Sequence, residues 1–542
     1  MKDLKTCIRG FLRMSRPMYG RMVAYILIGC ANTALSLCFV WICKRLVDIV
    51  TGHNAAPLGT SVVLLTAIML GQLIVRVASQ YYVNYNTVRT QNELRLSYFS
   101  HVLYSRWNGR ETFRSGDAVN RLQEDVRILT DLICNRVPGV IITILQLVAS
   151  SVYLLHLDSS LLWVLLVFMV VAVVGSKMFF NKFRQLTKTI REEESDVQQI
   201  MQENLQNRVL VLTLFGARNV VGRMNDVQTS LKRHTVTRLN YNAAARGFMS
   251  FGFLGGYAAA FLWGIFGIKA GTVTYGMMTS FLQLVGQVQR PVADLGNQVP
   301  AFIKALTSIE RLLELEELQL ETYHGDVVFP GAPGIMIKDV TFGYEDRDVL
   351  KDFSHDFKPG SFTVVAGPTG VGKSTLTRLM LGLLKPSSGS VTLYSGNGMG
   401  HPANVDTRCN FMYVPQGNSL LSGTIRENML LANADASDQE MEDALRTAAA
   451  EFVFSLEDGL DTVCGESGTG LSEGQCQRIA IARALLHPGG VMILDEATSS
   501  LDMETEERLL DNIRDKYKGI KTVVFISHRP AATRLADNVL NL

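Results

Sequence analysis

Residues 364–375 read Val-Val-Ala-Gly-Pro-Thr-Gly-Val-Gly-Lys-Ser-Thr, and this stretch decides the fold of the second half of the chain. Its leading apolar residues predict a buried strand, and the rest fits the pattern Gly-x-x-x-x-Gly-Lys-Ser of a phosphate-binding loop. In such a loop backbone N–H groups surround phosphate oxygens, the Lys373 ammonium reaches the β and γ phosphates, and the Ser374 hydroxyl holds Mg²⁺. The residues expected to contact the nucleotide are Gly367, Thr369, Gly370, Gly372, Lys373, Ser374 and Thr375.

One such match can arise by chance in a chain of 542 residues, but a second stretch supports it. Residues 491–496 read Val-Met-Ile-Leu-Asp-Glu, which predicts an apolar strand ending in two carboxylates. Asp495 at the end of a parallel strand near the loop is placed to bind Mg²⁺, and Glu496 is then positioned as a base for water. The two stretches together predict an α/β nucleotide-binding domain.

The first half of the chain has a different character, because it runs repeatedly through long apolar stretches. A helix needs about 20 apolar residues to cross the hydrocarbon core of a bilayer. Six stretches qualify or come close: 22–43, 61–78, 137–157, 159–176, 247–268 and 272–289. We therefore expect an α-helical six-span membrane domain over residues 1–310, a linker over 311–324 and the nucleotide-binding domain over 325–542.

The loops of the first half differ in length and charge. Spans three and four, and five and six, are separated by about three polar or small residues and predict tight hairpins. Segments 80–136 and 177–246 are long, helical in pattern and rich in arginine. Because basic loops stay inside, both long segments and both termini are expected in the cytoplasm, with helices that continue well past the bilayer.

Polar residues mark two further places in the first half. The sixth span carries Gln283, Gln287, Arg290, Asp294 and Gln298 at steps of three or four, so they share one helix face. Such a face is typical of a translocation pathway, although Arg290 and Asp294 could also simply pair with each other near the cytoplasmic end. Residues 4–13 alternate apolar and basic residues, which suits a helix lying in the headgroup layer, with a solvated basic tail as the alternative.

Composition excludes several other classes of protein. The formal net charge of +2, without a basic aromatic patch, argues against a nucleic-acid partner. The eight cysteines form no C-x-x-C pair and no zinc spacing, so we expect reduced thiols. The first apolar run is too long for a signal-peptide core, and no cleaved leader is expected.

Residues 471–475 read Leu-Ser-Glu-Gly-Gln, and they lie between the phosphate loop and the acidic strand. This stretch resembles the LSGGQ signature of ABC ATPases, and the order of segments over essentially the whole chain resembles a half-size ABC exporter. The resemblance implies a P-loop α/β ATPase domain with a helical subdomain, ATP and Mg²⁺ as cofactors, and a second copy or a related half-transporter as partner.

The resemblance also implies roles for individual residues. It makes Tyr344 the aromatic that stacks on adenine, Ser500 to Asp502 the D-loop, and 115–121 and 212–216 the turns that couple to the ATPase domains. It implies that Glu496 polarises the attacking water, that His528 contacts the γ phosphate, and that Gln416 senses the nucleotide. Ser374, Gln416 and Asp495 would hold Mg²⁺, while Ser472, Gly474 and Gln475 of one subunit would cap the ATP of the other.

Two departures from the family pattern are visible. Glu473 stands where the signature usually has glycine, which brings a carboxylate near the nucleotide and predicts slower turnover. The chain also stops at Leu542, soon after His528, so the membrane half is expected to hold the dimer together.

We therefore expect ATP-driven export or flipping of an amphipathic lipid, drug or peptide in a bacterial inner membrane, by alternating access in a dimer. The alternatives are a heterodimer subunit with a slow or regulatory site, an importer built on the exporter fold, and an ATP-gated channel.

Overall fold

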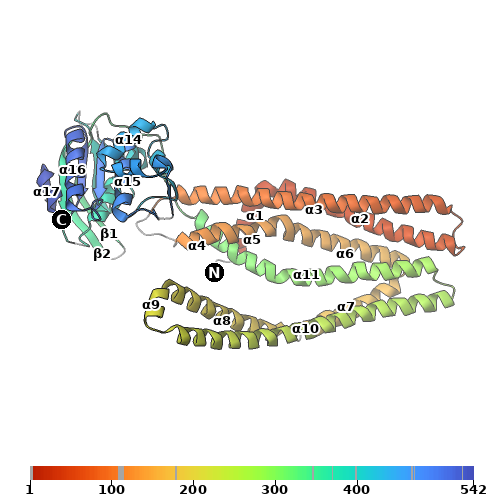
Figure 1. The fold of residues 1–542 in the computed structure, drawn as a ribbon. Helices are drawn as coiled ribbons and strands as arrows, with labels where there is room; N and C mark the ends of the chain where they lie inside the picture. Colours follow the sequence, from red (N-terminus) through yellow and green to blue (C-terminus); the bar gives the residue numbers. More distant parts are fainter. Residues whose placement is uncertain are drawn as a thin grey trace. The chain divides into compact units, whose positions relative to one another are not determined.

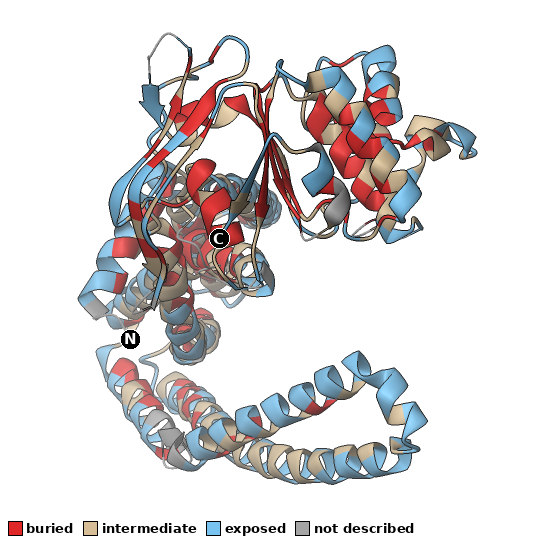
Figure 2. Ribbon diagram, turned by 90° about the vertical axis from the view of Figure 1, so that its left-hand side faces the viewer, coloured by how far each residue is buried: buried red, intermediate tan, exposed pale blue. Residues whose placement is uncertain are grey.

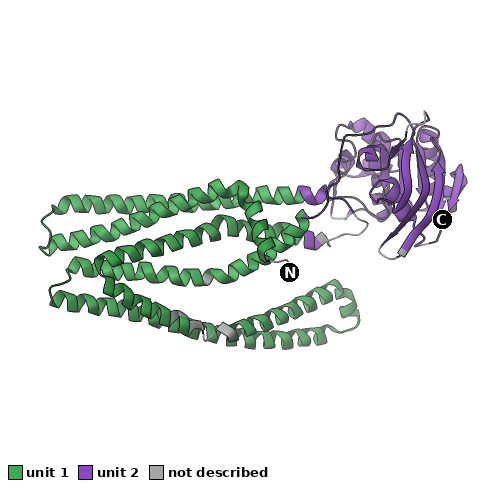
Figure 3. Ribbon diagram, turned by 180° about the vertical axis from the view of Figure 1, so that it is seen from behind, with its two compact units in different colours: residues 1–99, 119–316 green, residues 100–118, 317–542 purple. Residues whose placement is uncertain are grey.

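The computed structural model describes residues 4–107, 115–177, 180–344, 347–368, 370–396, 400–465, 468, 470–527 and 529–542. They divide into two compact units, one of residues 1–99 and 119–316 and the other of residues 100–118 and 317–542 (Figure 3). The expected sites at Thr369 and His528 lie outside the described residues.

The first unit is entirely helical in its described part. Its helices are α1 (Leu4–Ser15), α2 (Tyr19–Val50), α3 (Leu58–Leu103), α4 (Ser115–Asn120), α5 (Val126–Asp131), α6 (Val137–Leu157), α7 (Ser159–Lys177), α8 (Phe180–Gln206), α9 (Arg208–Thr213), α10 (Ala217–Lys269) and α11 (Tyr275–Glu316). A 3-10 turn, η1 (Arg16–Met18), joins α1 to α2, and the π-helical turns η2 (Arg121–Asp125) and η3 (Leu132–Arg136) join α4, α5 and α6.

Four helical stretches of the described chain are long and apolar enough to cross a membrane: Lys5–Val50, Leu58–Leu103, Gly116–Leu157 and Ala217–Lys269. A shorter apolar helix covers Ser159–Val171, and the stretch expected as the sixth span lies mostly on α11, which begins at Tyr275 rather than at 272. Only 11% to 22% of the residues in the most apolar windows are buried within the chain. Such exposed apolar faces suit contact with lipid, which solvates them as well as a protein core does.

The long helices continue past the thickness of a bilayer. α10 has 53 residues, which corresponds to about 80 Å of helix against about 30 Å of hydrocarbon. α10 packs along both α7 and α8, and α9 forms the turn at the far end of the α8–α10 hairpin (Figure 1). The arginine-rich segments thus form helical extensions, as their periodicity predicts.

Local hydrogen bonds explain where two of these helices begin. Asp158 separates α6 from α7, and its carboxylate accepts hydrogen bonds from the backbone N–H groups of Ser160 at 2.8 Å and Leu161 at 3.3 Å. α11 begins at Tyr275. Its second residue, Gly276, donates a 3.2 Å hydrogen bond from its backbone N–H to the carboxylate of Asp48, which is buried near the end of α2. Each carboxylate satisfies N–H groups that the first turn of a helix leaves unpaired.

α1 lies against the rest of the first unit on one side only. Cys7 and Met14 are buried, and a side chain at Gly10 would meet Leu313 of α11 at 2.9 Å. On the other side Ile8 and Leu12 are about half exposed beside exposed basic residues. A packed helix with a basic and apolar outer face favours the interpretation of 4–13 as a headgroup-layer helix over a solvated tail.

The second unit is built on two main sheets. An antiparallel sheet has the order β2-β1-β4-β5, and a parallel sheet has the order β11-β3-β10-β9-β6. The strands are β1 (Gly334–Tyr344), β2 (Arg347–Phe357), β3 (Phe362–Ala366), β4 (Ser388–Tyr394), β5 (Gly400–Pro402), β6 (Phe411–Val414), β9 (Val491–Asp495), β10 (Thr522–Ile526) and β11 (Asn538–Asn541); β7 (Gly423–Thr424) and β8 (Val463–Cys464) form a small ribbon. β10 therefore separates the phosphate-loop strand β3 from the acidic strand β9.

The parallel sheet is covered on both faces, and successive residues of its strands enter different cores. Val364, Met492 and Leu494 belong to one hydrophobic cluster, while Val365, Val491 and Ile493 belong to the other. This alternation is the two-residue period of a strand. Because both faces of the central strands are buried, β9 and β10 read as continuous apolar runs and are buried at every residue, as the red strands of Figure 2 show, whereas β11 at the edge of the sheet is largely exposed.

The helices of the second unit divide between the two cores. They are α12 (Lys373–Met380), α13 (Ile425–Leu430), α14 (Asp438–Thr447), α15 (Glu473–Leu486), α16 (Met503–Tyr517) and α17 (Pro530–Leu535). Leu376 and Leu379 of α12 pack in the core that also receives the antiparallel sheet, whereas apolar residues of α13 to α16 pack in the other. Figure 1 shows α14 and α15 side by side and α16 beside α17.

Candidate ATP site

The phosphate loop has a backbone that only glycine adopts without strain at several positions. Gly367, Gly370 and Gly372 have φ values of +154°, +86° and +115°. A Cβ atom at Gly372 would also meet Val349 at 2.9 Å. The loop that joins β3 to α12 therefore depends on its glycines for conformation as well as for close approach of a phosphate.

Lys373 opens α12 and is buried, with 7% of its surface exposed. Its ammonium donates hydrogen bonds to the carbonyl oxygens of Gly367 at 2.7 Å and Pro368 at 3.2 Å. The positive charge of Lys373 is thus held against the phosphate loop, at the position where a phosphate group would bind. Ser374 and Thr375 follow in the first turn of α12, where N–H groups point toward an anion.

Asp495 and Glu496 lie at the carboxyl end of β9. Asp495 is 4% exposed, and burial together with the neighbouring Glu496 carboxylate raises its pKa to about 6, although Arg378 and Lys373 oppose this effect. Glu496 has φ +48°, and its N–H donates a 3.0 Å hydrogen bond to the carbonyl oxygen of Ile526 on β10. The chain therefore turns sharply at Glu496, in a conformation that costs about 1–3 kcal/mol for such a residue.

Gln416 follows β6, the strand next to β9, and the structure brings it to Glu496. The side-chain amide of Gln416 donates a hydrogen bond to the Glu496 carboxylate at 2.5 Å. Parallel neighbouring strands end at the same edge of a sheet, which explains how residues 80 positions apart meet.

The oxygen donors near this edge fit a magnesium ion. Mg²⁺ binds hard oxygen ligands and usually takes only one or two carboxylates from the protein. Ser374 offers a hydroxyl, Asp495 a carboxylate and Gln416 an amide oxygen, and the described residues contain no cluster of three or more His, Cys, Asp or Glu that would form a complete protein cage.

Tyr344 ends β1 and lies beside the first turns of α12. Its hydroxyl oxygen accepts hydrogen bonds from Arg378 at 3.3 Å and Thr375 at 3.5 Å, and its ring packs edge-on against Phe342 with centroids 5.1 Å apart. The Arg378 guanidinium in turn stacks over the ring of Trp107 at 4.8 Å. Sequence reasoning did not identify Arg378, since one arginine on a helix has no distinguishing pattern.

The signature residues form the start of α15. Ser472 caps the helix, since its hydroxyl accepts from the N–H of Gln475 at 3.3 Å while the Gln475 side chain accepts from the N–H of Ser472 at 2.8 Å. Glu473 occupies the first helical position and is exposed. A Cβ atom at Gly474 would lie 2.9 Å from the carbonyl oxygen of Ser500, so this glycine permits close contact with the D-loop.

The turn after Glu496 is held by Arg529, a residue that the sequence did not single out, and by Asp502 of the expected D-loop. Arg529 donates hydrogen bonds to the carbonyl oxygens of Leu501 at 2.8 Å and Ser499 at 2.6 Å, and to the buried Glu506 carboxylate at 2.9 Å. Asp502 caps α16 by accepting from the N–H of Thr505 at 2.9 Å. Only the position of Arg529 directly after His528 could have drawn attention to it.

The pathway candidates on α11 divide into two groups. Gln287 hydrogen-bonds Ser36 of α2 at 3.0 Å and Ser150 of α6 at 3.3 Å, so its amide joins three helices of the same chain. Gln283 is half-buried, whereas Arg290 and Asp294 are exposed, and no ion pair joins these two described residues. Gln298 accepts a 2.8 Å hydrogen bond from Arg136. The simple Arg290–Asp294 pair is therefore not what the structure shows.

The two expected coupling turns differ in exposure. The first corresponds to α4 and the start of η2, where Arg121 is buried and donates to Glu314 at 2.6 Å. The second covers the end of α9 and the turn after it, where Leu212, Leu214 and Phe215 are exposed by 53%, 70% and 93%. Phe215 also has φ +54°, which holds the turn in a left-handed conformation.

Comparison with known proteins identifies both halves of the chain. The family described as the ABC transporter transmembrane region matches residues 22–292, and the family described as ABC transporter matches residues 350–499. An uncharacterized ABC transporter ATP-binding protein, YfiC, of Bacillus subtilis is 26% identical over 100% of this chain and 90% of its own length. A multidrug resistance ABC transporter of Lactococcus lactis is 26% identical over 99% of this chain and 91% of its own length.

A solved structure of a bacterial Atm1-family ABC exporter with ATP bound has the same fold. It covers 97% of this chain and 93% of its own length with a TM-score of 0.77, at 23% sequence identity. Phosphate loop, acidic strand and fused membrane helices thus define an ATPase coupled to transport across a membrane. The chain belongs to the ABC transporter family, with a transmembrane region fused to an ATP-binding domain, and it has the fold of an exporter-type half-transporter.

The predictions of fold class, family and ATPase activity are thereby confirmed. The protein is a multi-pass integral membrane protein that binds ATP, and its half-transporter fold implies a partner in a dimer. A count of six spans is consistent with the family.

Proposed function

We propose that the chain exports or flips an amphipathic lipid, drug or peptide across a bacterial cell membrane by alternating access in a dimer. In this proposal the membrane domain covers residues 1–310, a linker covers 311–324, the ATPase domain covers 325–542, and both termini lie in the cytoplasm. The names of two relatives support export: one, from Rickettsia bellii, is described as a putative export ATP-binding/permease protein, and the relative from Lactococcus lactis is described as a multidrug resistance ABC transporter.

The hydrogen bond between Gln416 and Glu496 beside the buried Asp495 is the observation that carries the ATP-hydrolysing part of this proposal. A hydrolytic site needs a base that reaches the attacking water, and the Glu496 carboxylate is held at the sheet edge next to the phosphate loop. Mg²⁺ bound with ATP supplies charge neutralisation on the phosphates. The chain contributes the Lys373 charge, the loop N–H groups and the Gln416–Glu496 pair, while Tyr344 offers an aromatic face for adenine.

The membrane half supports movement of a partly polar cargo. Arg290 and Asp294 are exposed on α11, the helix that also carries most of the apolar stretch expected as the sixth span. Charged groups at membrane depth normally face a water-filled cavity or a partner. A pathway between two copies that is lined partly by these residues would receive a cargo with both apolar and charged parts.

The test is ATPase activity and flux measured on the same liposomes. The full chain, reconstituted with an inward-accessible pool of fluorescent lipid, cationic drug or labelled peptide, should hydrolyse ATP faster in the presence of one cargo and move that cargo outward. Glu496→Gln should bind ATP and do neither. Outward flux that persists without ATP hydrolysis, or inward flux only, would contradict export.

A second candidate is a heterodimer subunit whose signature serves a slow or regulatory site. Glu473 favours it, because this exposed carboxylate lies beside Ser472 at the point expected to face the partner's ATP. A purified chain that binds ATP but hydrolyses none, and gains activity when mixed with a related half-transporter, would support this candidate.

A further inference from the structure

We propose that α15, besides carrying the signature residues in its first turn, positions the same chain's Gln416 and Glu496 through the side chains of Gln477 and Arg483. The proposal rests on the proposed function of Gln416 and Glu496 in hydrolysis. Neither Gln477 nor Arg483 belongs to the set of residues expected to touch nucleotide. Both are positioning residues, because each acts on a loop that carries a site residue.

Gln477 holds the turn that follows Glu496. It is 1% exposed, and its side-chain amide donates to the Ser499 hydroxyl at 3.1 Å while its carbonyl oxygen accepts from the backbone N–H of Ser500 at 3.1 Å. Glu496 and Ser499 are themselves joined by a 3.2 Å backbone hydrogen bond. The amide of Gln477 thus fixes a turn only three residues long after the expected base.

Arg483 holds the loop that follows Gln416. It lies nearly two helical turns after Gln477, and its guanidinium donates to the Ser419 carbonyl oxygen at 2.9 Å and to the Ser419 hydroxyl at 2.6 Å. Ser419 is half-buried, and the next residue, Leu420, is buried in the hydrophobic core. Two hydrogen bonds to a single residue fix both its position and its orientation.

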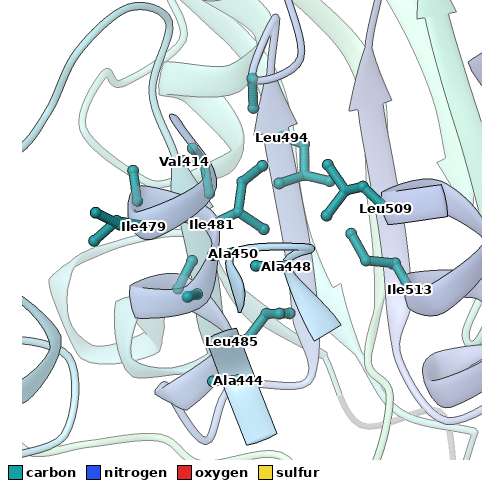
Figure 4. Packing of buried hydrophobic residues seen from close by; sticks show 14 of the residues in the cluster. Val414, Ala444, Ala448, Ala450, Ile479, Ile481, Leu485, Leu494, Leu509 and Ile513 are labelled. Carbon is teal, nitrogen blue, oxygen red and sulfur yellow. The ribbon is translucent and has the colours of Figure 1, made fainter. Parts of the chain in front are cut away.

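Packing makes α15 a rigid support for both loops. Ile479, Ile481 and Leu485 of α15 lie in one cluster with Val414 of β6 and Leu494 of β9, as Figure 4 shows. These two strands lead directly to Gln416 and Glu496. The close approach of Gly474 to the Ser500 carbonyl oxygen brings the first turn of the helix against the same loop.

The two loops also contact each other through their site residues, since Gln416 donates a 2.5 Å hydrogen bond to Glu496. α15 therefore anchors both the loop that carries Gln416 and the turn that follows Glu496. A displacement of α15 shifts both loops together, whereas loss of one anchor leaves the pair misaligned. A group misplaced by about 1 Å can lower the rate by about a hundredfold, so such anchors affect kcat more than ATP binding.

The test uses the full chain in lipid with Gln477→Met and Arg483→Met, and Arg483→Lys as the conservative variant. Matched controls are Asn512→Leu, which removes hydrogen bonds to the carbonyl oxygens of Arg446 and Thr447, and Arg426→Met, which removes ion pairs to Asp438 and Asp461. Amide hydrogen exchange is measured on peptides covering 415–421 and 497–502, beside kcat, KM for ATP and the unfolding temperature.

We expect Gln477→Met to raise exchange over 497–502 and Arg483→Met to raise it over 415–421, each by at least about fivefold, because each substitution removes two hydrogen bonds and the loss of one alone has an effect of about that size. We expect kcat to fall by about tenfold with KM changed less than about twofold, and Arg483→Lys to recover part of the loss. Unchanged exchange in both peptides would overturn the proposal. So would control variants that lose as much kcat at equal loss of unfolding temperature. If the wild-type chain hydrolyses no ATP, the proposed function fails, but the exchange data still decide whether α15 anchors the two loops.

Discussion

Gln416 and Glu496, 80 residues apart, are joined by a hydrogen bond of 2.5 Å in which the amide donates to the carboxylate. The contact exists because β6 and β9 are parallel neighbours and each residue follows the end of its strand. This hydrogen bond holds the Glu496 carboxylate in one orientation.

Glu496→Gln should remove hydrolysis while leaving ATP binding intact. General-base catalysis contributes about 10²- to 10⁴-fold, and the amide keeps the size of the side chain. ATPase rate and equilibrium binding of a fluorescent ATP analogue measure the two properties separately. A variant that retains more than about a tenth of the wild-type rate would show that another group activates the water.

Gly474→Ala should destabilise the contact between α15 and the D-loop. The added Cβ would lie 2.9 Å from the Ser500 carbonyl oxygen, a backbone atom that cannot move aside as a side chain can. Overpacking of this kind costs about 1–3 kcal/mol. Thermal unfolding and ATPase rate should both fall.

Gly396→Ala is the matched control, because nothing lies within 4 Å of the added Cβ atom and this glycine has no left-handed backbone. It should leave stability and rate near the wild-type values. Equal effects of the two substitutions would contradict the proposed steric cause.

Asp495→Asn should change how stability depends on pH. The folded pKa of Asp495 is raised to about 6 from 3.8, so the folded state binds its proton more tightly than the unfolded state does. The carboxylate therefore costs nothing at a pH below 3.8, and its cost grows as the pH rises from 3.8 to about 6, reaching at most about 3 kcal/mol.

The unfolding temperature of Asp495→Asn should therefore exceed that of the wild type at pH 7.5, and the difference should shrink toward pH 5. Measurements without nucleotide or Mg²⁺ isolate this effect. A difference that is constant over this range would indicate that Asp495 does not titrate there. The ATPase rate of the variant should fall, because an amide binds Mg²⁺ less well than a carboxylate does.

Phe215→Gly should separate ATP hydrolysis from its stimulation by cargo. The ring is 93% exposed in the single chain and sits at φ +54°, so its removal exposes no core and relieves backbone strain. The unfolding temperature should stay the same or rise. If the turn docks on a partner's ATPase domain, the basal rate persists while stimulation is lost.

Val221→Ser is the comparison for Phe215→Gly, since Val221 is also exposed, by 68%, but lies on α10 beyond the turn. It should retain stimulation. Retained stimulation in Phe215→Gly would show that the second coupling turn lies elsewhere.

Glu473→Gly should raise the turnover rate and slightly lower stability. A carboxylate in the first turn of a helix interacts favourably with the unpaired N–H groups, a contribution of about 0.3–1 kcal/mol, but it also repels the phosphates expected to approach Ser472. The ATPase rate should rise, and the rise should be larger at low ionic strength. A rate that falls would show that the carboxylate has a positive role in the site.

The sequence by itself determined the elements of this protein. The loop from Gly367 to Ser374, the strand ending at Asp495 and the long apolar helices are all encoded locally, in glycine positions and hydrophobic periodicity. Local hydrogen bonds likewise place Ser472 at the start of α15. Properties that depend on a few neighbouring residues can be read from the chain because the physical causes lie within one or two turns.

The tertiary structure alone decided which of these elements meet. The order of the parallel sheet places β10 between β3 and β9 and brings Gln416 to Glu496, and no local pattern encodes this order.

The contacts that Gln477, Arg483 and Arg529 make with nearby loops cannot be recognised from the sequence, since a polar residue has the same local pattern whether it faces solvent or a buried loop. The spacing of polar residues predicts that Gln287 lies on a polar helix face, but only packing shows that its amide bonds to Ser36 and Ser150. Such contacts depend on the summed burial of distant segments, which fixes their relative positions only once the whole domain has packed.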